Sequence, residues 1–548
     1  MPPAIAYGRY SFRLVPFLVA ILILAYTYRD LAYLSEPLRT PAGNVAGGKY
    51  EADTSVKNVP IKIQPDHGKE GGSTTTYKGN QNKHVSSTSP APTFYSVALT
   101  TPAIAVPTDY LPIYKADDEC PKLYGSKYFE HMASHHIEYC EPESLSKFEC
   151  FRTHRKESFC VGRGVLLDMT RGEGLKHTAM HCNMRNFTEE KVHTPALQDV
   201  LNVDDMGRGF YDTSVKCHLE QWDINTKAEN VASGANLCDA EHNDGNWTLL
   251  VKRENHPNFW HRMLEVWQSM VTLDVLKMAI NPATNAPYLK ESDIPNVRVV
   301  FTEYDRGTQL EVDAWWKMVT GNEPLYQKDL PPQCLGNVIL PLEESTSPFW
   351  EYTWSEGNCH DPFLINAFLR RLYRHLGLDA DDKVDKDGQT VVTIIDRKGT
   401  RKLRNQDKLV EKAQARWPQV KFQMIDFAST KLLDQVKIVR NTDVLLGLVG
   451  AGMTHMFWLP EESSVAEIQA PGVKYYGFRH LAKLRNLNYF TVFPEERPKE
   501  DLVTEGADWQ LGEWVDIKDD AFQSMVDAAI NAQLHKATRW AEVQHKEE

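Results

Sequence analysis

The sequence lacks three features, and each absence excludes a class of protein. None of its nine cysteines forms a C-x-x-C pair, which makes a zinc-binding module a poor interpretation. Its 61 basic residues are outnumbered by 74 acidic ones, and the formal net charge of −13 argues against a nucleic-acid-binding protein. No internal repeat is evident. At 548 residues the chain is too long for one ordinary core, so two domains plus tails are the natural expectation.

Long hydrophobic runs are also scarce, apart from one short segment near the N-terminus. Residues 14–28, LVPFLVAILILAYTY, carry no charge and lie between Arg13 and Arg29. Their number falls between a signal-peptide core and a full spanning helix, and no small-x-small cleavage site follows convincingly. We therefore expect a transmembrane signal anchor, with residues 1–13 as a cytosolic tail and the rest in the lumen of the Golgi or ER. A cleaved signal peptide is the alternative, and it would deliver the same domain to the same lumen.

The cysteines fit an oxidising compartment. After a targeting segment, disulfides are the better interpretation of nine cysteines, and the odd number leaves at least one thiol outside any pairing within the chain. Their connectivity is not readable from sequence. The sequons that begin at Asn186 and Asn246 are compatible with the same compartment.

The rest of the chain divides by composition. Residues 35–114 are rich in Ser, Thr, Pro, Gly, Asn and Lys without apolar periodicity, which predicts a flexible luminal stem. Residues 120–378 follow as an N-terminal α/β domain whose cysteine-rich first part is hard to assign. Beyond it, the apolar pattern predicts strands at Thr248–Val251, Val297–Phe301 and Val338–Leu340, and helices at Phe259–Ile280 and Pro362–Leu376.

Residues 390–495 have the most regular pattern in the sequence. Apolar runs predict strands, and amphipathic segments between them predict helices. Continuous apolar strands that alternate with helices indicate a doubly wound parallel sheet, whose ligands bind at the carboxyl ends of the strands. A helical tail is expected at residues 496–548. The predicted strands are Val391–Ile395, Val420–Ile425, Asp443–Val449, Val465–Ile468 and Tyr489–Val492, and the helices Asn405–Arg416, Thr430–Arg440, Met453–Leu459 and Tyr475–Arg485.

A glycine turn lies between a strand and a helix of this domain. Gly450 and Gly452, with Ala451 between them, permit close approach of the backbone to a ligand. The helix start that follows offers unpaired N–H groups and a positive dipole end, which suit a diphosphate. Thr454 and His455 in the first turn could add contacts to it. A tight strand-to-helix turn without ligand is the alternative.

Two further features of this domain could bind the same ligand. The loop Asp396–Arg404 is basic although the chain is acidic, and Arg397 and Arg401 could grip phosphate oxygens from the side opposite the glycines. Glu467 lies in an apolar strand, where a carboxylate needs a partner. Ribose hydroxyls and a buried ion pair with a nearby arginine are equally good candidates for that partner.

A candidate general base begins the long helix of the first domain. His261 and Glu265 are four residues apart and share a helix face, so the carboxylate could orient the imidazole and tune its charge. Such a pair could deprotonate an acceptor hydroxyl, and a surface His–Glu pair at a capped helix start is the alternative. The acidic residues of Glu303–Asp305 are too common a pattern to assign a metal, so no metal site is predicted.

Several blocks of sequence resemble family 61 of the glycosyltransferases. They occur in order within residues 120–495 and are strongest after residue 358. In the family's N-x-aromatic-His pattern, His261 takes the histidine position and Glu265 the acidic position one turn later. One departure is Val449, where family members commonly place histidine before G-A-G. The blocks are Val392–Arg397, Asn405-Gln406, Leu433–Val436, Asn441–Asp443, Gly450–His455 and Phe457–Pro460, with Ser158–Arg163 and Asn258–Glu265 in the first half.

This resemblance implies a fold and a reaction. The fold is a GT-B-like pair of Rossmann-type domains, with a UDP-sugar held mainly by the C-terminal one and the acceptor on the side of the N-terminal one. The reaction is an inverting transfer of a sugar, N-acetylglucosamine in the leading version, to Ser/Thr hydroxyls of a luminal glycoprotein. Transfer of another sugar such as xylose onto a glycan, and a UDP-binding pseudoenzyme, remain alternatives. The requirement for a divalent metal is left open.

Overall fold

All the described residues of the computed structural model lie in one part of the chain. The chain divides into two units, Met1–Ser87 and Thr88–Glu548, and the described residues belong to the second. The predicted cytosolic tail and anchor therefore lie outside them, and among the helices described, none is long and apolar enough to cross a bilayer. The described residues are 95–96, 105–106, 120–155, 157–170, 176–187, 215–225, 238–240, 245–254, 258–302, 310–360, 363–379, 388–471, 474–494, 514–535 and 540–542.

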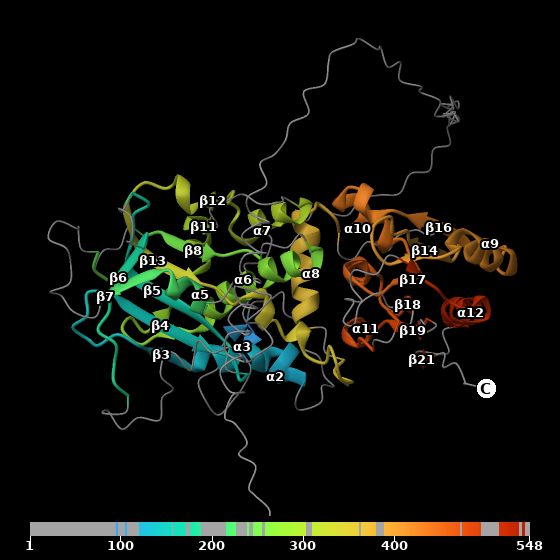
Figure 1. The fold of residues 1–548 in the computed structure, drawn as a ribbon. Helices are drawn as coiled ribbons and strands as arrows, with labels where there is room; N and C mark the ends of the chain where they lie inside the picture. Colours follow the sequence, from blue (N-terminus) through green and yellow to red (C-terminus); the bar gives the residue numbers. More distant parts are fainter. Residues whose placement is uncertain are drawn as a thin grey trace, which may run out of the picture. The chain divides into compact units, whose positions relative to one another are not determined.

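The first large sheet is mixed. β12, β11, β8 and β13 run parallel in that order, whereas β5, β4 and β3 continue the sheet from β13 as antiparallel neighbours (Figure 1). β6 pairs with β5, and β7 with β6. The nine strands are β3 (His136–Glu138), β4 (Lys147–Arg152), β5 (Ser158–Leu167), β6 (Thr178–His181), β7 (Trp222–Asn225), β8 (Trp247–Val251), β11 (Val297–Phe301), β12 (Leu325–Tyr326) and β13 (Gln333–Leu340).

This sheet differs from the Rossmann-type first domain expected from the sequence. Parallel neighbours need a crossover connection, whereas β4 and β5 follow one another closely and fold back as an antiparallel pair. A disulfide joins Cys150 and Cys160, which lie directly opposite each other in that pair. The cysteine-rich segment therefore forms the antiparallel edge of a mixed sheet.

Eight of the nine cysteines form disulfides, as the sequence predicted for an oxidising compartment. Cys217, in the short helix α5 (Val215–Glu220), is outside these pairs. The longest connection closes 239 residues and ties α2 (Cys120–Tyr124) to the segment before α8 (Phe363–His375). The pairs are Cys120–Cys359, Cys140–Cys182, Cys150–Cys160 and Cys238–Cys334.

The second large sheet is the parallel sheet that the sequence predicted. Its order is β16-β14-β17-β18-β19-β21, and all five pairings are parallel. Along the chain, β14 is followed first by its neighbour on one side, β16, and then by its neighbour on the other side, β17. Doubly wound domains bind ligands at such a switch point, here between β14 and β17. The strands are β14 (Val391–Ile395), β16 (Lys421–Ile425), β17 (Val444–Leu448), β18 (Ser464–Ile468), β19 (Asn488–Val492) and β21 (Trp540–Glu542).

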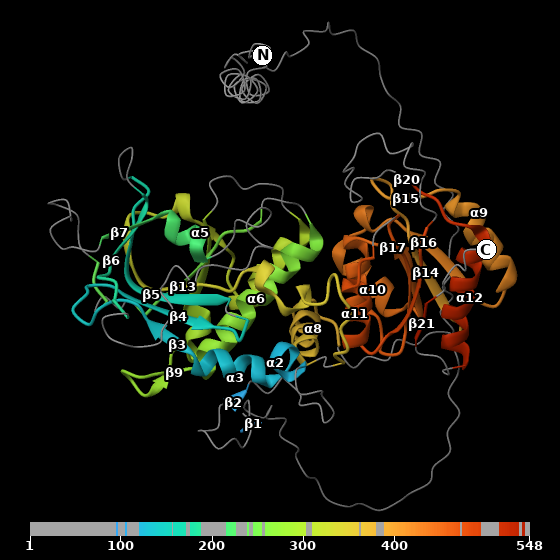
Figure 2. The same cartoon turned by 60° about the horizontal axis from the view of Figure 1, so that its bottom comes forward.

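Helices cover both faces of the second sheet. α10 (Leu432–Arg440) and α11 (Gly477–Leu484) lie on one face, and α9 (Gln406–Arg416) and α12 (Asp519–His535) on the other (Figure 2). Part of the predicted helical tail thus completes this domain, because α12 packs on the sheet and β21 adds its last strand. The helix predicted after the glycine turn is a 3-10 helix, η8 (Ala451–Trp458).

The long helix α6 (Phe259–Met278) lies at the centre of the core. All its residues except Phe259 and Lys277 are buried, as expected for a helix that is covered on every side. Trp267 stacks on Phe368 of α8 at 4.5 Å between ring centroids and contacts Phe457 of η8 at 5.8 Å. One continuous apolar cluster therefore links α6 with elements of both sheets.

The smaller elements connect these parts. Their bounds are β1 (Tyr95–Ser96), β2 (Ala105–Val106), α3 (Ser126–Ser134), β9 (Ile280–Asn281), β10 (Ala286–Pro287), η2 (Glu291–Asn296), η3 (Glu311–Trp315), α7 (Trp316–Thr320), η4 (Gln327–Asp329), η5 (Glu344–Thr346), η6 (Pro348–Trp350), β15 (Lys402–Leu403), η7 (Phe427–Ser429) and β20 (Trp514–Val515).

Candidate active site

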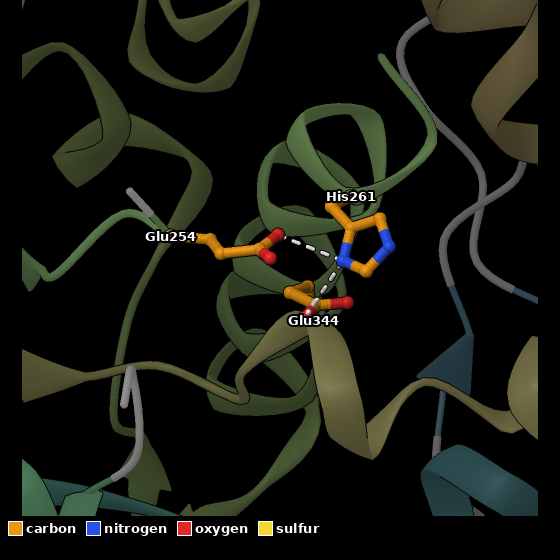
Figure 3. A group of neighbouring side chains, drawn as sticks. All are labelled: Glu254, His261 and Glu344. Atoms are coloured by element: carbon orange, nitrogen blue, oxygen red, sulfur yellow. Dashed lines mark hydrogen bonds and ion pairs between the residues drawn. The ribbon is translucent and has the colours of Figure 1, made fainter. Parts of the chain in front are cut away.

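His261 lies in the first turn of α6 between two carboxylates. Its Nδ1 is 2.7 Å from a carboxylate oxygen of Glu254 and 3.3 Å from one of Glu344 (Figure 3). All three residues are buried. The other ring nitrogen, Nε2, points away from both carboxylates (Figure 3). One nitrogen of the ring is therefore held by acids, and the other is directed elsewhere.

The parallel pairing of β8 and β13 brings this cluster together. Glu254 follows β8, and Glu344 begins η5 after β13, so both lie at the carboxyl ends of neighbouring parallel strands. The helix start that carries His261 is fixed by Asn258, whose side chain accepts a hydrogen bond from the Trp260 amide. The three side chains meet because the carboxyl ends of β8 and β13 bring both glutamates to the start of α6, which carries His261.

Trp350 closes this cluster on one side. Its indole Nε1 donates to the backbone oxygen of Glu344 at 3.0 Å and to the carboxylate at 3.2 Å. Its ring lies 5.1 Å from the ring of His261, centroid to centroid. The indole thus fixes the Glu344 carboxylate and borders the imidazole.

The carboxylates decide the protonation of His261. Burial alone would lower its pKa, but hydrogen bonds and charge from Glu254 and Glu344 outweigh burial and raise the pKa to about 9. Burial also raises the pKa of the Glu344 carboxyl, against the opposing effect of His261. An imidazole oriented in this way is a strong base once it has lost its proton.

The same three side chains could hold a divalent cation. One ligand atom from each of Glu254, His261 and Glu344 lies within 4.8 Å of the others. The 2.7 Å separation between His261 and Glu254 also has the length of a charge-assisted hydrogen bond. The acidic triplet Glu303–Asp305, to which the sequence analysis assigned no metal, lies outside the described residues.

Glu265, the predicted partner of His261, contacts the backbone of Glu254 and the side chain of Arg262. Its carboxylate accepts a hydrogen bond from the Glu254 amide and lies 3.6 Å from an Arg262 nitrogen. The carboxylates at His261 Nδ1 are instead those of Glu254 and Glu344. Glu265 thus positions the backbone of a residue that contacts the imidazole.

The glycine turn and the basic loop meet at the switch point of the second sheet. Gly450, the second residue after β17, has a φ of 136°, which favours glycine. Arg401 donates from Nη1 to the Val449 carbonyl at 2.9 Å, and the same nitrogen would lie 2.6 Å from a Cβ at position 450. Arg397 donates to the Thr400 carbonyl, and its Nη1 would lie 3.8 Å from a Cβ at Gly452. The structure therefore brings together both arginines and both glycines.

The residues after Gly450 line the start of η8. Ala451 begins this helix and is half-buried, whereas the hydroxyl of Thr454 is buried and has no hydrogen-bond partner among the described residues. An unsatisfied hydroxyl beside a helix start suits an anionic ligand. Val449 is buried in the apolar core and donates its amide to Ile468.

His455 is engaged within the protein. Its ring nitrogens lie 2.8 Å from the Gly452 carbonyl and 2.5 Å from the Gln435 side-chain oxygen. Burial lowers its pKa to about 4, so the ring is neutral and donates to one of these oxygens at a time. It also stacks between Phe259 and Phe427, with ring centroids 5.5 and 4.1 Å away. These contacts make His455 a support of the turn.

Glu467 is fully buried in the middle of β18. Its carboxylate accepts hydrogen bonds from the Tyr489 hydroxyl and, at 3.2 Å, from the Gln469 amide. Burial raises its pKa to about 8. Its partners are thus neutral side chains of the same sheet, and one of the two alternatives from the sequence, a buried ion pair with arginine, does not describe these contacts.

Aromatic contacts join the two candidate regions. Phe259, two residues before the candidate base, stacks on His455, and Trp260 stacks on Phe457 at 5.6 Å between centroids. The first turn of α6 therefore packs directly on η8, the helix that begins at the glycine turn. His261 and the glycine turn at Gly450 therefore belong to one continuous region of the structure.

Sequence reasoning missed Glu254 and Glu344. Glu344 is 83 residues from His261 in sequence, so no local periodicity connects them. The available signal was position, because both glutamates follow apolar strands whose carboxyl ends meet at one edge when the strands are parallel.

The sequence comparisons match a known family over part of this site. A family model described as Glycosyltransferase 61 matches residues 259–466, which run from the start of α6 into β18. The match includes His261, the basic loop and the glycine turn.

Three relatives share a single name, EGF domain-specific O-linked N-acetylglucosamine transferase. The chain is 33% identical to the Mus musculus protein over 149 residues, which is 25% of this chain and 27% of the relative. It is 31% identical to the Gallus gallus protein over 196 residues, 33% of this chain and 36% of the relative. For Drosophila melanogaster the identity is 27% over 175 residues, 30% and 32% of the two chains.

These alignments span about a quarter to a third of the relatives' length. Among solved structures, phosphoglycerate oxidoreductase from Vibrio cholerae aligns with 53% of this chain and 98% of its own at 9% identity, with a TM-score of 0.14. The family model and the named relatives agree that this chain is similar to glycosyltransferases, and the similarity to family 61 covers residues 259–466.

Proposed function

We propose that this protein is an inverting glycosyltransferase that moves N-acetylglucosamine from a UDP-sugar to Ser/Thr hydroxyls of secretory-pathway proteins. The observation that carries the proposal is the packing of the first turn of α6, with its candidate base His261, on η8, which begins at the glycine turn. A base and an anion-binding turn in contact are what a sugar transfer from a diphosphate needs.

The second sheet supplies the donor half of the site. The UDP diphosphate would bind at the start of η8, with the Gly450 and Gly452 turn below it and the guanidinium groups of Arg397 and Arg401 beside it. The Thr454 hydroxyl would donate to the same phosphates. This arrangement supports a GT-B-like enzyme whose C-terminal domain holds the nucleotide.

The first domain supplies the acceptor half. The acceptor hydroxyl would lie at His261 Nε2, the ring nitrogen that points away from Glu254 and Glu344 (Figure 3). As the hydroxyl oxygen bonds to the anomeric carbon, its proton passes to Nε2 and the bond from that carbon to UDP breaks. The arginines and the start of η8 stabilise the charge that develops on the departing UDP. A single displacement of this kind inverts the anomeric carbon.

The names of the relatives guide the choice of sugar and acceptor. They describe transferases that link N-acetylglucosamine to EGF domains, and we extend this donor and acceptor class to the present chain. A transferase that moves xylose onto a glycan would use the same base and diphosphate site.

Incubation of the full chain with UDP-N-acetylglucosamine or UDP-xylose and a recombinant EGF domain tests this assignment. The proposal expects UDP release and a mass increase of the EGF domain with the first donor. Turnover of UDP-xylose without turnover of UDP-N-acetylglucosamine would contradict the sugar assignment. UDP binding without transfer from any donor would instead favour a pseudoenzyme.

The compartment is part of the proposal. Four disulfides favour an oxidising compartment, which supports a catalytic domain in the lumen of the Golgi or ER. We propose that residues 14–28 anchor the chain there as a single-pass type II membrane protein. Protease protection in intact microsomes tests this topology, since a luminal domain resists digestion until detergent is added.

A further inference from the structure

Trp354 is the most exposed large hydrophobic residue that the structure describes. Its exposed fraction is 55%, although tryptophan is usually well buried. Its ring meets that of Tyr475 at a centroid distance of 5.6 Å and an interplanar angle of 88°. Two aromatic rings at a right angle thus form a corner at the surface.

The loop that carries Trp354 is fixed on both sides of the residue. Before it, the Thr353 carbonyl accepts a hydrogen bond from the Tyr476 amide at 2.8 Å. After it, the Gly357 carbonyl accepts one from the Lys483 ammonium group at 2.7 Å, and the disulfide from Cys359 follows. An exposed indole on a loop held at these points is a preorganised surface feature.

The same loop continues directly from the candidate active site. Trp350 borders the ring of His261 at 5.1 Å and donates to Glu344. Trp354 is four residues further along, so the two Cα atoms are at most about 14 Å apart even in a fully extended chain. With the lengths of the two indole side chains included, the ring of Trp354 therefore lies within roughly 28 Å of the imidazole, which about eight extended residues can span.

We propose that Trp354 and Tyr475 anchor a nonpolar side chain of the acceptor polypeptide, within about eight residues of the hydroxyl that receives the sugar. The inference rests on the proposed function and adds an acceptor subsite to it. Rigid aromatic residues next to a reaction centre are typical anchors for a polypeptide. Because the proposed acceptor is a polypeptide, we assign the corner between the two rings to one of its nonpolar side chains, which both rings could contact.

The variant Trp354→Ala of the full chain tests this anchor, with a recombinant EGF domain as the acceptor probe and UDP-N-acetylglucosamine as the donor. The KM for the EGF domain should rise about tenfold or more, while UDP affinity stays at the wild-type value. Trp354→Phe should restore most of the lost affinity because it keeps an aromatic ring. Leu534→Ala, at a 42% exposed residue of α12, serves as the control and should leave the KM unchanged.

Direct binding of the EGF domain to the same variants separates this inference from the proposed function. Weaker EGF-domain binding by Trp354→Ala supports the anchor even if no transfer is detected, in which case only the proposed function fails. A wild-type KM and wild-type EGF-domain binding in Trp354→Ala would overturn the anchor. So would an increased KM for a glycan acceptor together with unchanged binding of the EGF domain.

Discussion

Replacing Glu344 with glutamine tests how the two carboxylates set the basicity of His261. The carboxylate lies 3.3 Å from Nδ1, and glutamine keeps an oxygen that can accept from the Trp350 indole. A pKa of about 9 against the ordinary 6.5 corresponds to about 3 kcal/mol of net interaction favouring the imidazolium. Removing one of the two negative charges should lower the pKa of His261 by about 1 to 2 units.

The pH dependence of transfer reports this change. At pH 7 only about 1% of a base with a pKa near 9 is neutral, so wild-type kcat/KM should rise about tenfold per pH unit and level off near pH 9. In Glu344→Gln the midpoint should move to lower pH, and the plateau should fall because a weaker base removes the acceptor proton. The assay is transfer to an EGF domain between about pH 6 and 10.

A matched control comes from the neighbouring residue. The carboxylate of Glu343 accepts a hydrogen bond from the Ser345 hydroxyl at 3.1 Å, and Glu343→Gln should keep the wild-type midpoint. An unchanged midpoint in Glu344→Gln, with normal UDP binding, would refute the role assigned to this carboxylate. An equal displacement in both variants would show that the effect is not specific to the residue at the imidazole.

Stability should change with pH in the opposite sense to activity. A histidine whose folded pKa is raised contributes stability that is fully present below its unfolded pKa of about 6.5 and is lost as pH rises through about 9. The contribution of His261 to the free energy of unfolding should therefore fall by up to about 3 kcal/mol across this window. Glu344→Gln should show a smaller loss, which urea unfolding at several pH values can measure.

Three further substitutions test the donor half of the site. Gly450→Ala adds a methyl group at a φ of 136° and 2.6 Å from a guanidinium nitrogen, so UDP affinity by calorimetry should fall tenfold or more, whereas Gly399→Ala, with open space around it, should not change it. Arg397→Ala should weaken UDP binding about tenfold, with a larger effect at low salt. Tyr489→Phe removes a donor to the buried Glu467 and should lower the free energy of unfolding by about 1–3 kcal/mol without weakening UDP binding.

The C-terminal domain could be read from the sequence to a large extent. The apolar runs at Val391–Ile395 and Asp443–Val449 predicted β14 and β17 within one residue at each end, because strands buried on both faces need continuous apolar residues. Since parallel strands end at a common edge, the position of the basic loop also predicted that it lies close to the glycine turn, where Arg401 meets Gly450. The helix predicted after the turn at Met453–Leu459 is instead a 3-10 helix at Ala451–Trp458, so its type and both ends differ from the prediction.

The fold of the N-terminal domain was harder to predict from the sequence, because it depends on pairings between segments that lie far apart in the chain. Cys150 and Cys160 face each other across an antiparallel pair that no apolar pattern in that segment indicated. The sequence predicts Glu265 as the partner of His261, because residues four apart on a helix are neighbours whatever the rest of the fold is. The acids at Nδ1 come instead from loops after two strands that pair in space.

The central claim is that His261 is the base of a site whose UDP-binding groups lie in the other domain. It is tested most directly by His261→Ala, with UDP affinity and transfer from UDP-N-acetylglucosamine to an EGF domain measured on one preparation. We predict that transfer falls by a factor of about 100 to 10,000 while the Kd for UDP stays at its wild-type value. Near-normal turnover in this variant would contradict the claim.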